Sequence, residues 1–297
     1  MKIRSTTSRE KQRNFAPYLF LSPAITFFLV FILLPLLGSF GLSLISWDFF
    51  SKPKFVGIAN YSKLINDDIM FSAIRNTFLF TFASIITHVG LGLLLAVAVN
   101  RKIPRFFAYI IRTTIFFPFL ISWSACSLIW NFGLDPSFGA INYYAHKIGL
   151  PEATLLSHTW ALPTLIVIDL WKTLGFSFIV ILAGIQNIPK DITEAAIMDG
   201  ANGWKLFWGI TFPLCSPAIF FVSVTAFIGA FQIFEPMYIM TRGGPDNSTL
   251  SIVEYLHMTA FRNFDIGYGA VISVVIFIVV LLATLFQFRI SKFWVAE

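Results

Sequence analysis

Apolar residues gather into six long runs, and polar residues are concentrated in the segments between them. A helix needs about 20 apolar residues to cross the hydrocarbon core of a bilayer. Each run reaches that length, and charged residues are rare inside it. The pattern therefore predicts an all-α, polytopic membrane protein with six transmembrane helices, over residues 19–45, 77–99, 113–132, 161–183, 212–240 and 268–288.

The composition excludes two broad classes of protein. The chain has 297 residues, of which 57% are hydrophobic and 12% are charged, whereas a soluble domain carries about 25% charged residues. So few charges cannot cover the surface of a water-soluble enzyme of this size. A disordered chain is excluded as well, because such chains are poor in apolar and aromatic residues and this one contains 35 Phe.

The positions of the basic residues predict the orientation of the chain. The net charge of +6 does not indicate a nucleic-acid partner, because Lys and Arg lie between the apolar runs and form no single patch. They favour the N-terminal tail, the connections after the second and fourth runs, and the C-terminal end, and such enrichment marks the cytoplasmic side. We therefore expect a cytoplasmic tail at residues 1–16, a transmembrane domain at 17–290 and a second cytoplasmic tail at 291–297.

The two cysteines, Cys126 and Cys215, lie in or beside apolar runs and lack the spacing of metal ligands. We interpret them as packing residues and expect neither a metal site nor a disulfide. The first apolar run is too long for the core of a signal peptide and is followed by no small-residue cleavage site, so we expect it to remain as a helix.

The connection between the fourth and fifth runs has the residues of a helix, a turn and a second helix. Pro189 is typical of a helix start and Gly200 of a helix end, and Asn202 is positioned to cap the helix that follows. Exposed apolar residues beside Glu194 and Asp199 would make this cytoplasmic connection a docking surface for another protein.

Within residues 187–213, a four-part motif with fixed spacing points to a family. Glu194-Ala195-Ala196 is followed after three residues by Gly200 and, after nine more, by Ile210-Thr211-Phe212-Pro213. This arrangement resembles the EAA loop of ABC importer permeases, whose pattern ends in Ile, any residue, Leu and Pro. The chain departs from that pattern with Phe212 in place of Leu, which exchanges one apolar residue for another.

Three further segments resemble the carbohydrate type of these permeases, the maltose- and glycerol-phosphate-like group. They are residues 55–61 (FVGIANY), residues 139–142 (GAIN) and residues 240–245 (MTRGGP). Together they favour a sugar or sugar-like solute. The resemblance extends over residues 17–290, which is nearly the whole chain.

The resemblance implies a fold, partners and a location. A permease of this kind has the type I importer fold, lies in the bacterial plasma (inner) membrane and pairs with a second, homologous permease subunit. Two ABC ATPase subunits dock on its cytoplasmic side, and an extracytoplasmic solute-binding protein delivers the substrate.

The same resemblance assigns residues to two docking surfaces. The EAA loop is the coupling helix that sits in a cleft of the ATPase, so coupling would involve Glu194, Ala195, Ala196, Asp199 and Gly200. The turn after the fifth helix would contact the binding protein through Gly243, Gly244 and Pro245.

The chain contains no Gly-x-x-x-x-Gly-Lys-Ser/Thr loop for binding a nucleotide phosphate. We therefore expect no catalytic residue and no cofactor here, and ATP hydrolysis by a separate subunit. Closure of that ATPase on ATP would switch the permease between inward-open and outward-open states.

Two ionisable residues, Asp169 and Lys172, lie inside the fourth apolar run. Such residues are costly in a membrane, by about 2.5–3.5 kcal/mol on insertion scales, and each is a candidate for a functional site. They are three positions apart on one helical face, so two interpretations stay open: they neutralise each other, or they line a polar cavity.

Alignment on the EAA motif carries substrate contacts of the maltose-type permease onto this chain. A polar sugar contact falls at or next to Asp169, and another falls on Thr173. The contacting positions of the fifth span are small or apolar here, which leaves Gln232 or Glu235 to supply hydrogen bonds. The candidate aromatic platforms for a sugar are Trp123, Trp130 and Trp171.

A secondary transporter or channel is the main alternative, with Asp169, Lys172 and His88 as its coupling groups. We see no pair of matching broken helices in two halves, which such a transporter would favour. An intramembrane enzyme is excluded because the four histidines are scattered along the chain. Within the importer class, a non-sugar solute such as glycerol phosphate stays open.

Overall fold

The computed structural model describes residues 6–100, 103–149 and 151–295. The chain divides into two compact units, one formed by Met1–Asn66 with Thr259–Val275 and the other by Asp67–Met258 with Ile276–Glu297. The described part contains five helices that are long and apolar enough to span a membrane, or six when one sharply bent pair is taken as a single span. The predicted all-α membrane fold is confirmed.

The first unit contains a long apolar helix and the short connection that follows it. The apolar helix covers Pro17–Leu42, and none of its most apolar stretch is buried within the chain, so its surface is available to lipid or to another protein. The elements of this unit are α1 (Thr6–Phe28), η1 (Leu29–Leu33), α2 (Leu34–Leu42), β1 (Ile45–Ser46), β2 (Lys54–Phe55) and α3 (Ala59–Ile65), with the first part of α13 (Ile266–Ser291).

Polar contacts fasten this segment to the start of α13. The strands β1 and β2 pair antiparallel, an element that the all-α prediction did not include. The Asn60 amide donates hydrogen bonds to the carbonyls of Ser43 and Ile45, each at 2.9 Å. Lys63 forms an ion pair with Asp265 at 2.6 Å. The connection between the first apolar helix and α4 is therefore tied down at several points.

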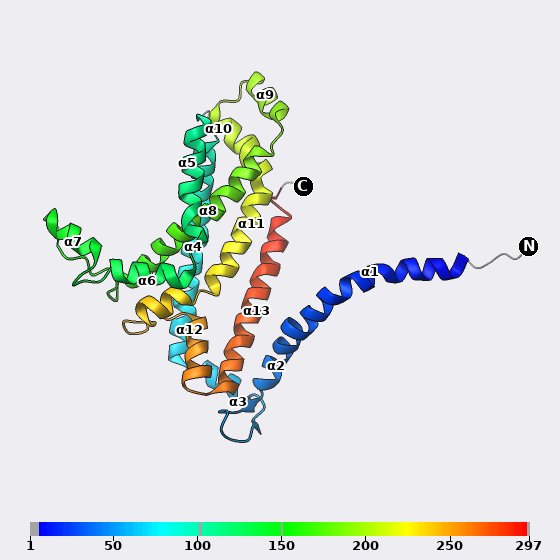
Figure 1. Ribbon diagram of the computed structural model, residues 1–297, viewed down its shortest axis with the longest axis vertical. Coiled ribbons are helices and arrows are strands. Elements are labelled where there is room, and N and C mark those ends of the chain that lie inside the picture. Colours follow the sequence, from blue (N-terminus) through cyan, green and yellow to red (C-terminus); the bar gives the residue numbers. More distant parts are fainter. Residues whose placement is uncertain (1–5, 101–102, 150, 296–297) are drawn as a thin grey trace, which may run out of the picture. The chain divides into compact units, whose positions relative to one another are not determined.

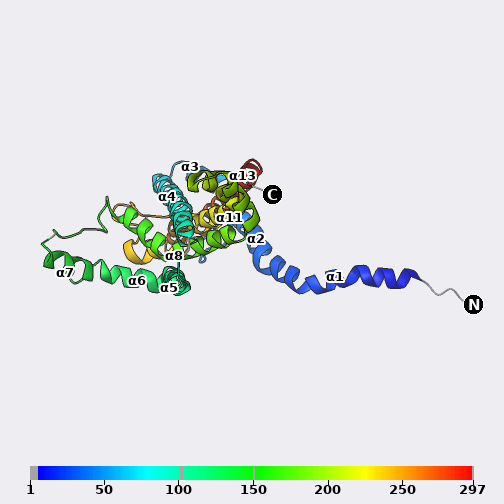
Figure 2. The same ribbon diagram turned by 90° about the horizontal axis from the view of Figure 1, so that it is seen from above.

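The second unit is built around three helices that run side by side: α4 (Asp68–Val99), α8 (Ala161–Gln186) and α11 (Phe212–Phe231) (Figures 1 and 2). Their contacts form the core of this unit. The remaining elements are α5 (Arg105–Phe116), η2 (Phe117–Leu120), α6 (Trp123–Gly133), α7 (Ala140–Lys147), α9 (Lys190–Met198), α10 (Gly203–Leu206), η3 (Phe207–Thr211), η4 (Met237–Thr241) and α12 (Ile252–His257), while η5 (Met258–Arg262) joins the two units.

The third span is broken, which corrects the continuous helix predicted over residues 113–132. Helix α5 and the 3-10 turn η2 end at Leu120, and α6 departs at an angle of 97°. Pro118 lacks the N–H that would continue the helical hydrogen bonding. Ser122 then starts a new helix, because its side chain accepts a hydrogen bond from Ala125 N.

The fifth span also differs from the prediction, which placed it over residues 212–240. The continuous helix covers Gly203–Phe231, so it begins earlier and ends sooner. Gln232 and Glu235 therefore lie beyond the helix, in the connection to η4. The chain turns next at Gly243, whose φ of +75° favours glycine.

The connection between α8 and α11 has the predicted form of a helix, a glycine turn and a second helix. Helix α9 ends before Gly200, whose φ of +80° also favours glycine. The side chain of Asn202 accepts a hydrogen bond from Lys205 N at 3.0 Å and so caps α10. The order of helix, turn and cap is confirmed.

The contact between α5 and α8 depends on Gly175. A Cβ atom at this position would lie 2.6 Å from the Cα of Phe116, closer than real contacts allow. We expect Gly175→Val to separate the two helices at a cost of about 1–3 kcal/mol, and to lower both the membrane level and the melting temperature of the purified protein. Gly90→Val in α4 is the matched control, because nothing lies within 4 Å of its added Cβ. Equal behaviour of the two variants would contradict the proposed contact.

Candidate functional site

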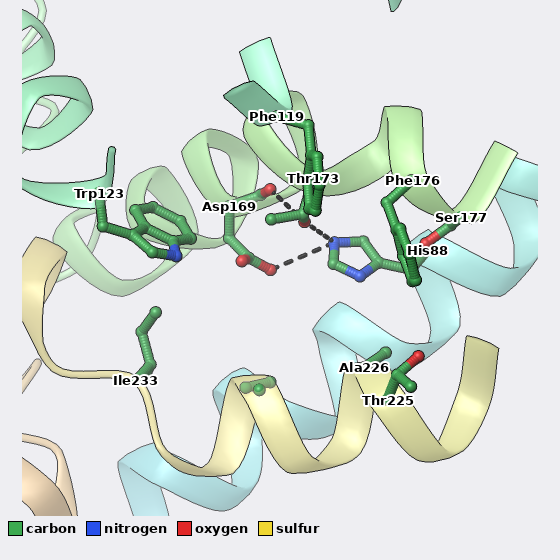
Figure 3. Close-up of a pocket in the computed structure, with 12 residues that line it drawn as sticks. His88, Phe119, Trp123, Asp169, Thr173, Phe176, Ser177, Thr225, Ala226 and Ile233 are labelled. Atoms are coloured by element: carbon green, nitrogen blue, oxygen red, sulfur yellow. Dashed lines mark hydrogen bonds and ion pairs between the residues drawn. The ribbon is translucent and has the colours of Figure 1, made fainter. Parts of the chain in front are cut away.

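A cavity of about 220 Å³ lies among α4, α8, α11 and the break in the third span (Figure 3). One side is polar, the walls are largely aromatic, and the side formed by α11 consists of small or short side chains. Its lining residues are His88, Phe119, Trp123, Asp169, Thr173, Phe176, Ser177, Thr225, Ala226, Gly229, Ala230 and Ile233.

The polar side is organised by the Asp169 carboxylate, which is 4% exposed. Ser84 Oγ donates a hydrogen bond to Asp169 Oδ2 at 2.8 Å, and His88 Nε2 lies 3.3 Å from the same oxygen. Both contacts connect α4 to α8. They also supply the partners that a buried carboxylate requires.

The hydrogen bonds of Thr173 assign the tautomer of His88. The hydroxyl of Thr173 donates to the Asp169 carbonyl at 2.7 Å, and its oxygen lies 2.9 Å from His88 Nε2. Because the hydroxyl hydrogen is already used, Thr173 accepts from His88, so Nε2 carries a hydrogen. That N–H also faces Asp169 Oδ2, as Figure 3 shows.

Lys172 does not pair with Asp169. Its ammonium lies 3.5 Å from the Phe119 carbonyl and 4.8 Å from the centre of the Trp123 ring. Lys172 is 4% exposed and is absent from the cavity lining. Lys172 and Asp169 therefore form no ion pair within the described residues, and Lys172 instead connects α8 to both sides of the break in the third span.

His88 is the residue whose role the sequence did not show. Ser84 and His88 are four residues apart and share one face of α4, where no acidic residue lies near them along the helix. The partner, Asp169, comes from α8. The sequence does contain a polar pair at positions i and i+4 of one apolar helix and a carboxylate in another. Spacing along a single helix does not show that the two helices bring these groups together.

The aromatic walls are formed by three side chains. The rings of Phe119 and Phe176 stack with their centres 5.4 Å apart and an interplanar angle of 19°. Trp123, at the start of α6, lies on the side of the Asp169 carboxylate away from His88 in the view of Figure 3. Trp130 and Trp171 pack edge to face on each other and are not among the cavity-lining residues. Of the three tryptophans considered, Trp123 therefore borders the cavity.

Helix α11 contributes space and little polarity. Nothing lies within 4 Å of a Cβ added at Gly229, which keeps this side of the cavity open. Thr225 bonds within its own helix, to the Phe221 and Val222 carbonyls. Gln232 is exposed and Glu235 is half-buried, and neither is part of the cavity lining.

The coupling-loop residues lie on an exposed surface. Glu194, Ala195, Asp199 and Gly200 are exposed and Ala196 is half-buried. Glu194 has no ion pair within the described ranges of the chain. Large apolar side chains are exposed beside these residues, namely Ile197, Met198 and Trp204.

The Gly-Gly-Pro segment forms an ordered turn. The hydroxyl of Thr249 donates to the Gly244 carbonyl at 2.9 Å, and Thr249 N donates to the Gly243 carbonyl at 3.1 Å. A Cβ on Gly243 would lie 2.8 Å from Leu250 Cδ1. The turn predicted after the fifth span, at Gly243, Gly244 and Pro245, is therefore present.

Residues 88–292 match the family described as the binding-protein-dependent transport system inner membrane component. The chain belongs to this family. The match includes most of the cavity lining, the coupling loop and the Gly-Gly-Pro turn. The predicted identity as an ABC importer permease is confirmed.

Individual permeases support the assignment over nearly the whole chain. The lactose transport system permease protein LacF of Rhizobium radiobacter is 34% identical, over 97% of this chain and 99% of LacF. The sn-glycerol-3-phosphate transport system permease protein UgpA of Agrobacterium fabrum is 32% identical, over 92% of this chain and 93% of UgpA.

A solved structure shows the same fold. It is a bacterial alginate ABC transporter in complex with an alginate pentasaccharide-bound periplasmic protein, and the matched chain gives a TM-score of 0.85 at 24% identity. The alignment covers 97% of this permease and 98% of that chain. The permease is therefore a multi-pass protein of the inner membrane that works in a binding-protein-dependent transport system.

The contact of His88 with Asp169 can be tested by a double-mutant cycle. We expect His88→Leu and Asp169→Leu each to cost about 3–5 kcal/mol of stability, because each leaves a buried polar partner behind. The double variant should cost less than the sum, by about 0.5–3 kcal/mol, as followed by denaturant unfolding of the purified protein.

The matched control for this cycle combines Asp169→Leu with Thr225→Val. Thr225 lines the same cavity but bonds within α11, so these two costs should add. If the costs of His88→Leu and Asp169→Leu add in the same way, the two side chains are not coupled.

Proposed function

We propose that the permease carries a neutral, hydroxyl-rich solute, a sugar or short oligosaccharide, across the bacterial inner membrane. The observation that carries the proposal is the cavity in which a buried carboxylate faces aromatic walls. Sugar sites combine hydrogen-bonding groups with a flat aromatic surface. Thr173, like Asp169, lines this cavity, and we assign both to the substrate pathway.

The carboxylate has one oxygen to offer a solute. The contacts of Ser84 and His88 both fall on Asp169 Oδ2. Oδ1 can therefore accept a hydrogen bond from a sugar hydroxyl. The Trp123 ring lies on the same side of the cavity and presents a flat surface to the C–H face of a sugar ring (Figure 3).

The charge of the cavity favours a neutral solute over a phosphorylated one. No Lys or Arg belongs to its lining in the part of the chain that the structure describes. The nearby Lys172 is engaged with Phe119 and Trp123. A phosphate would meet the Asp169 carboxylate in a medium of low dielectric, where like charges repel strongly. LacF, named for lactose, therefore suggests the solute class better than UgpA, named for sn-glycerol 3-phosphate.

The proposal includes the partners and orientation of an ABC importer. A second, homologous permease subunit would complete the translocation pathway, and two separate ATPase subunits would hydrolyse ATP. Helix α9 would enter a cleft of the ATPase through Glu194 and its neighbours, since these residues are exposed beside apolar side chains. Both termini would then lie in the cytoplasm, and the Gly243–Gly244–Pro245 turn would face the binding protein.

Gln232 and Glu235 remain candidates for a later stage of the pathway. They follow α11 outside the cavity lining. We propose that these two side chains meet the solute only outside the cavity and that direct contact within the cavity rests with Asp169 and Thr173.

One feature of the structure favours the alternative of a secondary transporter, namely the buried contact between His88 and Asp169. Family membership favours the ATP-driven importer. Uptake by proteoliposomes without ATP distinguishes the two, since an importer is inactive there.

Charge reversal tests the coupling surface. We expect Glu194→Lys to abolish ATP-driven uptake while the subunit still inserts and accumulates, because it reverses the charge that α9 offers to the ATPase. Asp191→Lys on the same helix is the control; Asp191 is equally exposed but lies outside the motif. If Glu194→Lys takes up solute at the level of the wild type, the proposal that α9 couples the permease to the ATPase is wrong.

Solute preference tests the cavity. We expect proteoliposomes with the complete transporter and its binding protein to take up neutral oligosaccharides and not glycerol 3-phosphate. Asp169→Asn should lower sugar uptake about tenfold, because charge-assisted hydrogen bonds are roughly twice as strong as neutral ones. Glu152→Gln, an exposed carboxylate outside the cavity, is the control. Preferred uptake of the phosphate ester, or full activity of Asp169→Asn, would contradict the proposal.

A further inference from the structure

Helix α5 carries two adjoining cavities whose linings share no residue with the proposed solute cavity. One, of about 470 Å³, lies where the C-terminal ends of α4 and α8 meet the N-terminal end of α5. The other, of about 240 Å³, continues along α5 toward Leu120. Tyr109 and Arg112 line both cavities, so the two form one continuous site.

The first cavity is basic. Arg105 and Arg112 contribute guanidinium groups to it, and Asn100 and Gln186 add side-chain amides. No Asp or Glu is present in this lining, and neither arginine forms an ion pair among the residues whose structure is described. The cavity therefore presents two cations without a protein anion.

Arg112 shows that an acceptor is missing. Its Nε is buried, yet that atom has no hydrogen-bond partner within the described chain. A buried donor without an acceptor is unfavourable, and more so when it is charged. A guanidinium satisfies this requirement best with a phosphate or carboxylate, which it binds with two parallel hydrogen bonds.

The second cavity is apolar. Beyond the shared residues, its lining consists of Thr113 and the apolar side chains of Phe116, Phe117, Leu120 and Ile179. Phe117 and Leu120 are 61% and 68% exposed. The α5 positions recur at intervals of three and four, so they follow one face of the helix away from the arginines.

We propose that this site binds an anionic glycerophospholipid such as phosphatidylglycerol. Its phosphate lies between Arg105 and Arg112, and an acyl chain follows the apolar groove toward Leu120. The basic cavity continues into the apolar groove, just as the charged headgroup of a lipid continues into its acyl chains. A free phosphate would leave the groove empty, whereas basic pockets between transmembrane helices are typical sites for anionic headgroups.

Lipid retention by the complete transporter tests the site. The complex is extracted with its partners, equilibrated in mixed micelles with equal amounts of phosphatidylglycerol and phosphatidylethanolamine, repurified and analysed by mass spectrometry for bound lipid. We expect phosphatidylglycerol to be enriched. Arg105→Gln and Arg112→Gln should each lower the enrichment about fivefold, the effect of one cation at an anionic surface.

Arg289→Gln is the matched control, because Arg289 is an exposed arginine in the last turn of α13 and lies outside both cavities. It should leave the enrichment unchanged. Phe117→Ser should lower retention through the groove while both arginines remain. If Arg112→Gln fails to assemble, Arg105→Gln decides the result, because Arg105 is exposed and its loss leaves no cavity.

Three results would overturn the proposal. The first is the absence of phosphatidylglycerol enrichment in the wild-type complex. The second is a loss of enrichment in Arg289→Gln as large as the loss in Arg105→Gln and Arg112→Gln. The third is displacement of the lipid by excess inorganic phosphate without any effect of Phe117→Ser, which would make the pocket a phosphate site. The readout is bound lipid, so its outcome is independent of which solute the permease carries.

Discussion

The buried carboxylate of Asp169 is the constraint on which the central helices depend. A charge inside the bilayer is tolerated only where protein groups or water replace its hydration. Ser84 and His88 provide this replacement from α4, while Thr173 fixes the imidazole from α8. The same contacts that stabilise the charge therefore set the position of α4 against α8. Both contacts fall on Oδ2, so Oδ1 is left for the solute under the proposed function, and one side chain would then serve both structural stability and solute recognition.

The sequence predicted the number and order of the spans well, because the apolar runs reflect a solvent requirement that acts on each helix separately. It could not predict which proline would break a span. Pro23 lies inside α1, and Pro35 follows a π-helical turn without ending the helix. Pro118 does end one, because Ser122 immediately caps a new helix in another direction. The outcome depends on residues on both sides of the proline and on what the new helix contacts.

The sequence identified residues of the candidate site, but it did not show which of them contact one another. Asp169 was identified because a carboxylate in an apolar run is unusual, but the one partner considered for it, Lys172, was taken from the same helix. The long side chain of Lys172 reaches the Phe119 carbonyl and the Trp123 ring instead, where cation–π attraction and the carbonyl compensate for its desolvation. His88 and Asp169 belong to helices that are distant along the chain, and their meeting depends on helix packing that periodicity does not determine.

The unburied first helix has a consequence for biogenesis. No residue in the most apolar stretch of Pro17–Leu42 is buried, and a helix of this length and hydropathy is stable in lipid alone. Helices that are stable singly insert first and associate in a later step. This helix therefore does not depend on prior folding of the other spans for its insertion.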